Sequence, residues 1–341
     1  MRRGKLSSDF YTKTKSENGV VEIHVPTLPV LYKYQPVTEY SLSNFEHDEI
    51  WGTAPVAFND PYDCAICYSR AKFENAIRKR LLPEKEKIYK KYYGLTRKED
   101  LIKRLAHDIC EQDSFKRQYV VSCFSVNNDS EIMWAHYADA AKGFCLAYEG
   151  NALMEAAKKS SQSLINCLTG LGFYNGSAPT VSTSDCIMPI IYDDRKANAT
   201  DQLIEAVPYG MKYIDVLLGL CSPAEAERIL GNDYIQMLID RSQKNRHIYQ
   251  NMICRKNKVW EYEQEWRIIS HNENIYRGDN NNTHMRIGNV VAGAVYLGER
   301  MPEYNRRVVI GIARSKNIPI YEMRSEMYSH NFRLKSYPIN S

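Results

Sequence analysis

The densest group of chemistry-bearing side chains lies between Lys258 and Ile269, where three carboxylates alternate with aromatic residues. From Tyr262 onward the two-residue period predicts a strand, on which Glu263 and Glu265 share one face. Because two carboxylates this close repel each other, we expect one to be paired with a cation or to have a raised pKa. Flanking residues offer the aromatic walls and fixed cation that suit a pocket carboxylate: Trp260, Trp266 and Arg267. The alternative is an edge strand with solvated glutamates.

A second cluster follows the apolar run Cys123–Ser125 and spans Met133–Asp139. Its pattern predicts a short helix at 132–139, on which His136 and Asp139 share a face. A histidine oriented by a carboxylate can act as a base or a metal ligand, but such a pair also forms structural hydrogen bonds. We expect no catalytic metal, because the sequence has no HExxH pattern and no second histidine nearby. The GxSxG, Walker and dinucleotide-binding motifs are also absent, so any chemistry must come from residues that the fold brings together.

The composition is that of a globular protein: 341 residues, of which 44% are hydrophobic and 25% charged. A formal charge of +4 does not by itself indicate nucleic-acid binding. We expect no transmembrane helix and no signal peptide, because long apolar runs are absent. Nine cysteines, mostly in apolar runs, predict free thiols in a cytoplasmic protein. Cys64 and Cys67 form a lone CxxC pair, which we interpret as packing.

The order of the expected strands and helices predicts one α+β domain at 20–341, which would position these residues. It follows a segment at 1–19 that is predicted to be flexible. Strands are expected near both ends of the sequence, with a helical insertion at about 150–255. The predicted strands are 31–34, 49–53, 119–125, 143–148, 187–192, 262–269, 290–297, 318–322 and 331–335. The predicted helices are 41–45, 70–104, 132–139, 206–220, 224–254 and 303–315, with Pro208 in a first turn. Loops are expected at 170–185 and 271–284.

The segment from Arg70 to Arg104 is strongly basic, with thirteen Lys or Arg and five Asp or Glu. Such a run is commonly a solvated helix face, but it can also bind phosphates. One alternative for function is therefore a non-catalytic module that binds nucleic acid or protein through these helices. A further alternative is a metal-dependent nuclease or hydrolase using these side chains: Asp60, Asp63, His136 and Glu265.

Four segments occur in a characteristic order: Tyr32–Tyr34, Phe58–Asp63, Cys123–Ser125 with Met133–Asp139, and Trp260–Arg267. Their order and spacing resemble the bacterial "domain of unknown function 2971" family over about residues 30–335. The segment Val295–Gly298 fits this pattern as well. The family name implies no activity.

The order of these parts also resembles the ADP-ribosyltransferase fold, a split mixed or antiparallel sheet that binds NAD as a substrate. The resemblance implies that the first strand contacts the NAD ribose through Lys33, or through Tyr32 and Tyr34. Those enzymes have His, Arg or a similar polar residue there, so Lys33 is a departure from their pattern. The resemblance also implies that Ser125 lies near the nicotinamide.

Glu263 and Glu265 have the Glu-x-Glu form of the catalytic motif in that fold. Loss of nicotinamide leaves an oxocarbenium-like ribose. The resemblance implies that Glu265 stabilises this charge, while Glu263 orients the acceptor or holds Glu265, and His136 is a third catalytic candidate. Further candidates for contacts with NAD, which core packing or turn formation would also explain, are Asn59, Asp60, Trp134, Tyr137 and Arg267.

The resulting hypothesis is an NAD-dependent, ADP-ribosyltransferase-like enzyme of the cytoplasm that needs no metal. This activity fits a toxin or phage-defence effector that modifies nucleic acid or protein. The sequence does not specify the acceptor, the oligomeric state or the trigger.

Overall fold

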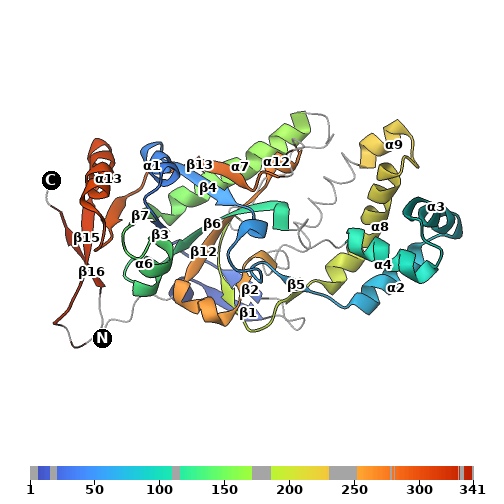
Figure 1. Ribbon diagram of the computed structural model, residues 1–341, viewed down its shortest axis with the longest axis horizontal. Helices are drawn as coiled ribbons and strands as arrows, with labels where there is room; N and C mark the ends of the chain where they lie inside the picture. Colours follow the sequence, from blue (N-terminus) through green and yellow to red (C-terminus); the bar gives the residue numbers. More distant parts are fainter. Residues whose placement is uncertain are drawn as a thin grey trace.

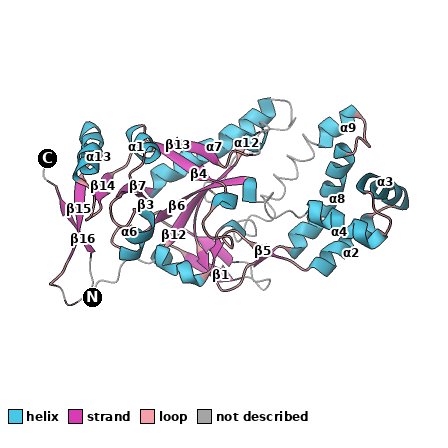
Figure 2. Cartoon of the chain, in the orientation of Figure 1, coloured by secondary structure: helices cyan, strands magenta, loops and turns pink. Residues whose placement is uncertain are grey.

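A mixed sheet runs through the centre of the molecule and carries helices on both faces (Figure 1). The computed structural model describes residues 7–15, 21–109, 116–170, 186–229, 252–276, 279, 281–328, 330 and 334–339. Strands β15 (Ile320–Ser325) and β16 (Leu334–Pro338) lie at one end of an elongated molecule, and a group of helices forms the other end (Figure 2). The fold is α+β, as the sequence predicts.

The main sheet contains ten strands within the described residues. Eight follow one path, in the order β13 (His284–Asn289), β4 (Glu49–Thr53), β6 (Tyr119–Ser125), β3 (Val30–Gln35), β7 (Phe144–Glu149), β14 (Ala294–Leu297), β15 (Ile320–Ser325) and β16 (Leu334–Pro338). The other two branch from β6: β12 (Glu265–His271) pairs with β6, and β8 (Ile187–Pro189) pairs with β12. All these pairings are antiparallel except that of β14 with β15.

Alternation along the strands separates two apolar layers. One face packs against α1 (Glu39–Glu46), α7 (Gly150–Gly170) and α13 (Glu303–Ser315). The other face packs against α6 (Glu131–Tyr137). On β3, Leu31 joins the first layer, whereas Tyr32 and Tyr34 face α6.

A second core holds the helices at the far end of the molecule (Figure 1). It joins α2 (Arg70–Arg80), α3 (Pro83–Tyr93), α4 (Lys98–Ile109) and α8 (Thr200–Leu217), and α9 (Pro223–Arg228) follows α8. The helical region therefore combines the basic segment with part of the predicted insertion. Helix α7, which also lies in the predicted insertion, packs against the main sheet instead. The predicted loop at 171–185 and the predicted helix at 230–251 lie outside the described residues.

Short elements complete the described chain. They are η1 (Ser7–Phe10), β1 (Thr12–Lys15), β2 (Val21–His24), η2 (Pro55–Ala57), β5 (Ile66–Cys67), β9 (Ile191–Tyr192), β10 (Ala197–Asn198), β11 (Arg255–Lys256), η5 (Lys258–Glu263) and α12 (Glu273–Tyr276). Strand β1 lies within the segment predicted to be flexible and pairs with β2, which follows that segment. Residues 1–6 and 16–20 lie outside the described residues. None of the helices in the described chain has the length and hydropathy of a membrane span.

Several predicted element boundaries were wrong. The strand expected from Tyr262 begins at Glu265, because residues 258–263 form a 3-10 helix and Gln264 has a left-handed backbone with φ of 45°. Helix α6 ends at Tyr137 rather than at Asp139, whose φ is 47°. Helix α8 begins at Thr200, so Pro208 lies inside the helix and not in its first turn. Strand β13 was not predicted.

Candidate functional site

A cavity lies where the main sheet splits. Strand β12 runs along one side of β6, and on the other side β3 pairs at Ser125 while β4 pairs at Val121. These positions are four residues apart, or about 13 Å along a strand. The cavity between the diverging strands has a volume of about 320 Å³. It is lined by Tyr32, Lys33, Tyr34, Trp51, Thr53, Ala57, Phe58, Asn59, Asp63, Val121, Cys123, Phe124, Ser125, Met133, Tyr137, Lys256, Glu263 and Glu265.

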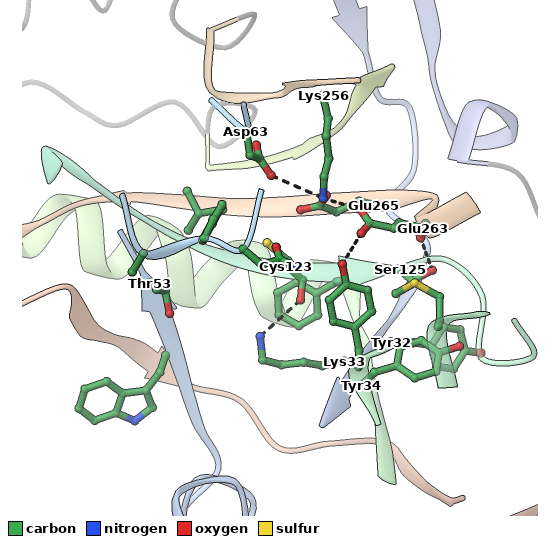
Figure 3. A pocket seen from close by; sticks show the side chains of 18 residues that line it. Tyr32, Lys33, Tyr34, Thr53, Asp63, Cys123, Ser125, Lys256, Glu263 and Glu265 are labelled. Carbon is green, nitrogen blue, oxygen red and sulfur yellow. Dashed lines mark hydrogen bonds and ion pairs between the residues drawn. The ribbon is translucent and has the colours of Figure 1, made fainter. Parts of the chain in front are cut away.

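Lys33 occupies the split itself (Figure 3). Its Nζ donates hydrogen bonds to Ser122 Oγ at 2.9 Å and to the Cys123 carbonyl at 3.4 Å, and it lies 4.9 Å from the Phe124 ring centre. Lys33 thus supplies donors to β6 between the points where β3 and β4 pair with it. These partners are neutral, and burial lowers the pKa of Lys33.

Opposite Lys33, a second lysine joins three carboxylates (Figure 3). Lys256 Nζ lies 2.6 Å from Glu263 Oε2, 3.1 Å from Glu265 Oε2 and 3.5 Å from Asp63 Oδ2. All four side chains are buried. Lys256 Nζ also lies 4.9 Å from the ring centre of Trp260, which forms a cation–π contact.

Arg267 supports this cluster from behind and is fully buried. Its Nη2 lies 2.6 Å from Asp63 Oδ2 and its Nε 2.7 Å from Glu265 Oε1. Nη1 donates to the Ile253 carbonyl at 2.6 Å. Three carboxylates therefore face two cations, and the cluster is neutral when one carboxyl group carries a proton.

The two glutamates titrate differently. Burial, and next the charge of Glu265, raise the pKa of Glu263 to about 7, against the opposing effects of Lys256 and Tyr137. Burial alone would also raise the pKa of Glu265, but Arg267 and Lys256 outweigh it and hold that pKa well below its usual value. The site thus pairs a permanent anion with a carboxyl group that exchanges a proton near neutral pH, which is the pattern of an acid–base pair.

Neighbouring elements fix both glutamates. Tyr137 Oη, from α6, donates to Glu263 Oε1 at 2.5 Å. Ser125 Oγ donates to the Glu263 carbonyl at 2.7 Å, and the Glu265 N–H donates to Tyr192 Oη at 2.8 Å. Because Gln264 between them has a left-handed backbone, the two carboxylates approach Lys256 from a 3-10 helix and a strand rather than from one strand.

Most of the candidates named from the sequence meet in this cavity. Those that line it are Tyr32, Lys33, Tyr34, Asn59, Ser125, Tyr137, Glu263 and Glu265. Arg267 lies behind Glu265 and does not line the cavity. Segments separated by more than 200 residues along the chain thus contribute to one site.

Three candidates lie elsewhere. On α6, Met133 and Tyr137 are four residues apart and face the cavity, so their neighbours on the helix point in other directions. Trp134 is buried against Tyr34, and its Nε1 donates to a backbone carbonyl at 2.8 Å. His136 is exposed, with Nδ1 3.0 Å from the hydroxyl of Tyr262.

Asp60 is the third of these candidates, and its contact is a local one. Its Oδ1 accepts a hydrogen bond from the Tyr62 N–H at 2.8 Å. This is the turn-forming bond that residues of this type commonly make. The structure therefore places Asp60 beside the cavity-lining Asn59 but within the turn.

Two polar or aromatic cavity residues that sequence reasoning missed are Lys256 and Trp51. Lys256 comes from the short strand β11, whose basic sequence resembles many surface segments. Trp51 lies on β4, with 38% of its surface exposed and Nε1 bonded to Glu49 at 3.0 Å. The signal for Trp51 was present: an aromatic residue on the polar face of an alternating strand, with Glu49 and Thr53.

The described residues contain no group of three or more His, Cys, Asp or Glu side chains arranged to hold a metal. Asp63, Glu263 and Glu265 converge on Lys256 instead. Seven cysteines are described as free thiols, including Cys64 and Cys67, while the side chains of Cys110 and Cys167 lie outside the description.

Ion pairs occupy much of the basic helical segment. Its acidic partners come from the same helices and from α8: Arg70–Glu74, Arg78–Glu99, Lys85–Asp215, Lys90–Glu86, Lys98–Glu86 and Arg104–Asp108. These pairs neutralise part of the positive charge and join the helices. Phosphate binding by this segment stays a prediction.

Residues 133–268 match a family model described as "Protein of unknown function (DUF2971)". The matched region includes most of α6, Lys256 and both glutamates of the site. This match supports the first resemblance drawn from the sequence. No curated protein and no solved structure gave a match, so the resemblance to ADP-ribosyltransferases has no support from these comparisons.

Proposed function

We propose that the protein cleaves the bond between nicotinamide and ribose in NAD and transfers the ADP-ribose to an acceptor. The observation that carries this proposal is the pair of buried glutamates, one a permanent anion and one titrating near neutral pH, in a cavity at the split of a sheet. A cavity of about 320 Å³ is at the small end of ligand sites. It suits the nicotinamide and ribose groups, with the rest of the dinucleotide extending past the rim.

Each glutamate has a separate role in this reaction. The bond between ribose C1′ and the pyridinium nitrogen breaks, its electron pair leaves with neutral nicotinamide, and positive charge develops on the ribose. Glu265 stabilises this charge as a buried anion, and the low local dielectric strengthens the interaction. Glu263 accepts the proton from the acceptor hydroxyl or amine as that group bonds to C1′.

Release of nicotinamide from NAD tests the proposal directly. We expect Glu265→Gln to lower the rate by on the order of a hundredfold or more, because the variant keeps the shape of the side chain but loses its charge. Two carboxylates then face two cations, so the cluster remains balanced and the variant should fold. Glu263→Gln should reduce transfer to an acceptor more than hydrolysis. Glu261→Gln is a matched control, because Glu261 is an exposed residue of the same 3-10 helix.

Melting temperatures of all variants check that the folded population is the same. The proposal fails if the parent protein releases no nicotinamide with water, nucleic acid or protein as acceptor. It also fails if Glu265→Gln matches the parent rate, in which case Glu265 is a structural partner of Arg267 and Lys256.

A further inference from the structure

The two glutamates of the cluster differ in the cations that they contact. Glu265 contacts two cations, with Arg267 at 2.7 Å and Lys256 at 3.1 Å. Among the described residues, the Glu263 carboxylate pairs with Lys256 at 2.6 Å and accepts a hydrogen bond from the neutral hydroxyl of Tyr137. The charge balance of Glu263 therefore depends on Lys256 far more than that of Glu265 does.

A separate two-stranded ribbon brings Lys256 to this position. Strands β9 and β11 pair in parallel, with Lys256 opposite Tyr192. The hydroxyl of Tyr192 accepts the N–H of Glu265 at 2.8 Å, so the ribbon contacts the start of β12 at two points. Lys256 is 6% exposed, so its ammonium has lost nearly all contact with water.

Stability alone is a weak explanation for this arrangement. Removing a lysine and three carboxylates from water costs several kcal/mol per ion, and their mutual attraction often does no more than offset that cost. Apolar side chains of the same size would commonly stabilise such a site equally well. A buried cation beside a titratable carboxyl group in a cavity indicates a functional role instead.

We propose that Lys256 is a positioning residue whose ammonium group, 2.6 Å from Glu263, holds this side chain ready to take the proton of the acceptor. This inference rests on the proposed function, in which Glu263 takes the proton of the acceptor. Burial and the anion of Glu265 both favour the protonated form of Glu263, whereas the positive charge of Lys256 favours the ionised form. The charged and titratable groups around Glu263 come from six segments: Asp63, Tyr137, Tyr192, Lys256, Tyr262, Glu265 and Arg267.

The test compares Lys256→Met and Lys256→Arg with the parent protein. Lys256→Met keeps the length of the apolar chain and removes the charge, so Glu263 should stay protonated to higher pH. We expect the pH of half-maximal nicotinamide release to move upward by about one unit or more. At pH 7 a shift of one unit should lower the rate by about fivefold. Lys256→Arg restores the positive charge and should return the midpoint toward that of the parent.

The matched control is Lys258→Met, two residues along the chain. The side chain of Lys258 is 56% exposed and is paired with Asp194 at 3.3 Å. The same loss of a lysine charge at this surface position should leave the pH profile unchanged. A profile that moves equally in both variants would show a general charge effect and would overturn the assignment of Lys256.

Carboxyl titration by NMR separates this inference from the proposed function. In protein labelled with ¹³C-glutamate, and with Glu263→Gln to assign the signal, Glu263 should titrate near pH 7 in the parent and higher in Lys256→Met. This measurement needs no activity, so it decides the role of Lys256 even if the parent releases no nicotinamide. An unchanged or lower midpoint in Lys256→Met overturns the inference. If Lys256→Met does not fold, a Glu263 midpoint near the ordinary value for glutamate in the parent or in Lys256→Arg overturns it.

Discussion

A left-handed turn follows α6 and can be tested by one substitution made at two positions. Asp139, Ala140 and Ala141 have φ values of 47°, 52° and 63°, a conformation that residues other than glycine rarely adopt. Tight packing holds the turn in place, since a Cβ at Gly298 would lie 2.2 Å from the Ala141 carbonyl oxygen. The strain matters for the site, because α6 carries the cavity-lining Tyr137 immediately before the turn.

Ala140→Gly should stabilise the protein, whereas Ala135→Gly should destabilise it. Both alanines are exposed, so neither change removes buried apolar surface. At Ala140, glycine relieves about 1–2 kcal/mol of left-handed strain and loses about 0.5–1 kcal/mol through chain entropy. The net gain is about 0.5–1 kcal/mol. At Ala135, within α6, glycine has only the unfavourable effect, of about 0.5–1 kcal/mol.

Differential scanning calorimetry measures the contrast. For a chain of 341 residues that unfolds in one transition, a difference of about 1.5 kcal/mol corresponds to about 2 °C in melting temperature. We therefore expect Ala140→Gly to melt about 2 °C above Ala135→Gly, with the parent between them. If both variants melt below the parent by the same amount, Ala140 is not in a left-handed conformation and the account of the turn is refuted.

Two further predictions concern pH and the cavity rim. Burial lowers the pKa of His271 to about 4, from 6.5, so the unfolded chain binds the proton at a pH where the folded protein does not. His271 therefore contributes stability above about pH 6.5 that is lost as the pH falls toward 4. His271→Phe should flatten the melting-temperature profile in this range, and an unchanged slope would contradict the assignment. If Trp51 stacks on the adenine of NAD, Trp51→Ala should weaken NAD binding by about three- to tenfold. Nicotinamide mononucleotide, which lacks the adenine, should bind as before. Calorimetry with both ligands measures this difference. An equal loss of affinity for the two ligands would show that Trp51 does not contact the adenine.

Local patterns predicted the regular elements well. The strands at 49–53 and 119–125 and the helix at 303–315 have the observed ends, because their side-chain periods match one apolar face and the helix is preceded by Pro302. The errors fall where backbone geometry changes without a matching change in pattern. Gln264 is left-handed although it is not a glycine, and this single residue converts the expected strand before Glu265 into a 3-10 helix.

The position and the short regular part of β13 explain why this strand was not predicted. Strand β13 lies at the edge of the sheet, with His284, Arg286 and Asn289 exposed, and it carries a register irregularity between Arg286 and Gly288. The buried Met285 and Ile287 alternate with polar residues, so a strand signal was present, but it is short and ends at this irregularity. Its pairing with β4 depends on the tertiary structure, which no local window contains.

The candidate site was predicted in outline but not in its charge balance. The sequence indicated that two neighbouring carboxylates need a cation, and Arg267 was available within the same segment. It could not indicate that Lys256 pairs with both Glu265 and Asp63, because these contacts depend on the ribbon β9–β11 and on a turn 200 residues earlier. Helix register was the other limit: a shift of one position on α6 separates Trp134 in the core and His136 in solvent from Met133 and Tyr137 in the cavity.

Burying the charged groups of this site costs free energy. Five ionisable groups converge where the sheet splits, and replacing such groups with apolar residues is often neutral or stabilising. The split also costs β6 some of its strand pairing, which Lys33 offsets with donors from its side chain. A continuous sheet with an apolar centre would avoid both costs. Their combination beside a cavity is expected if the charges act on a ligand, since a preorganised anion and a tuned acid stabilise a developing positive charge only when they are held away from water.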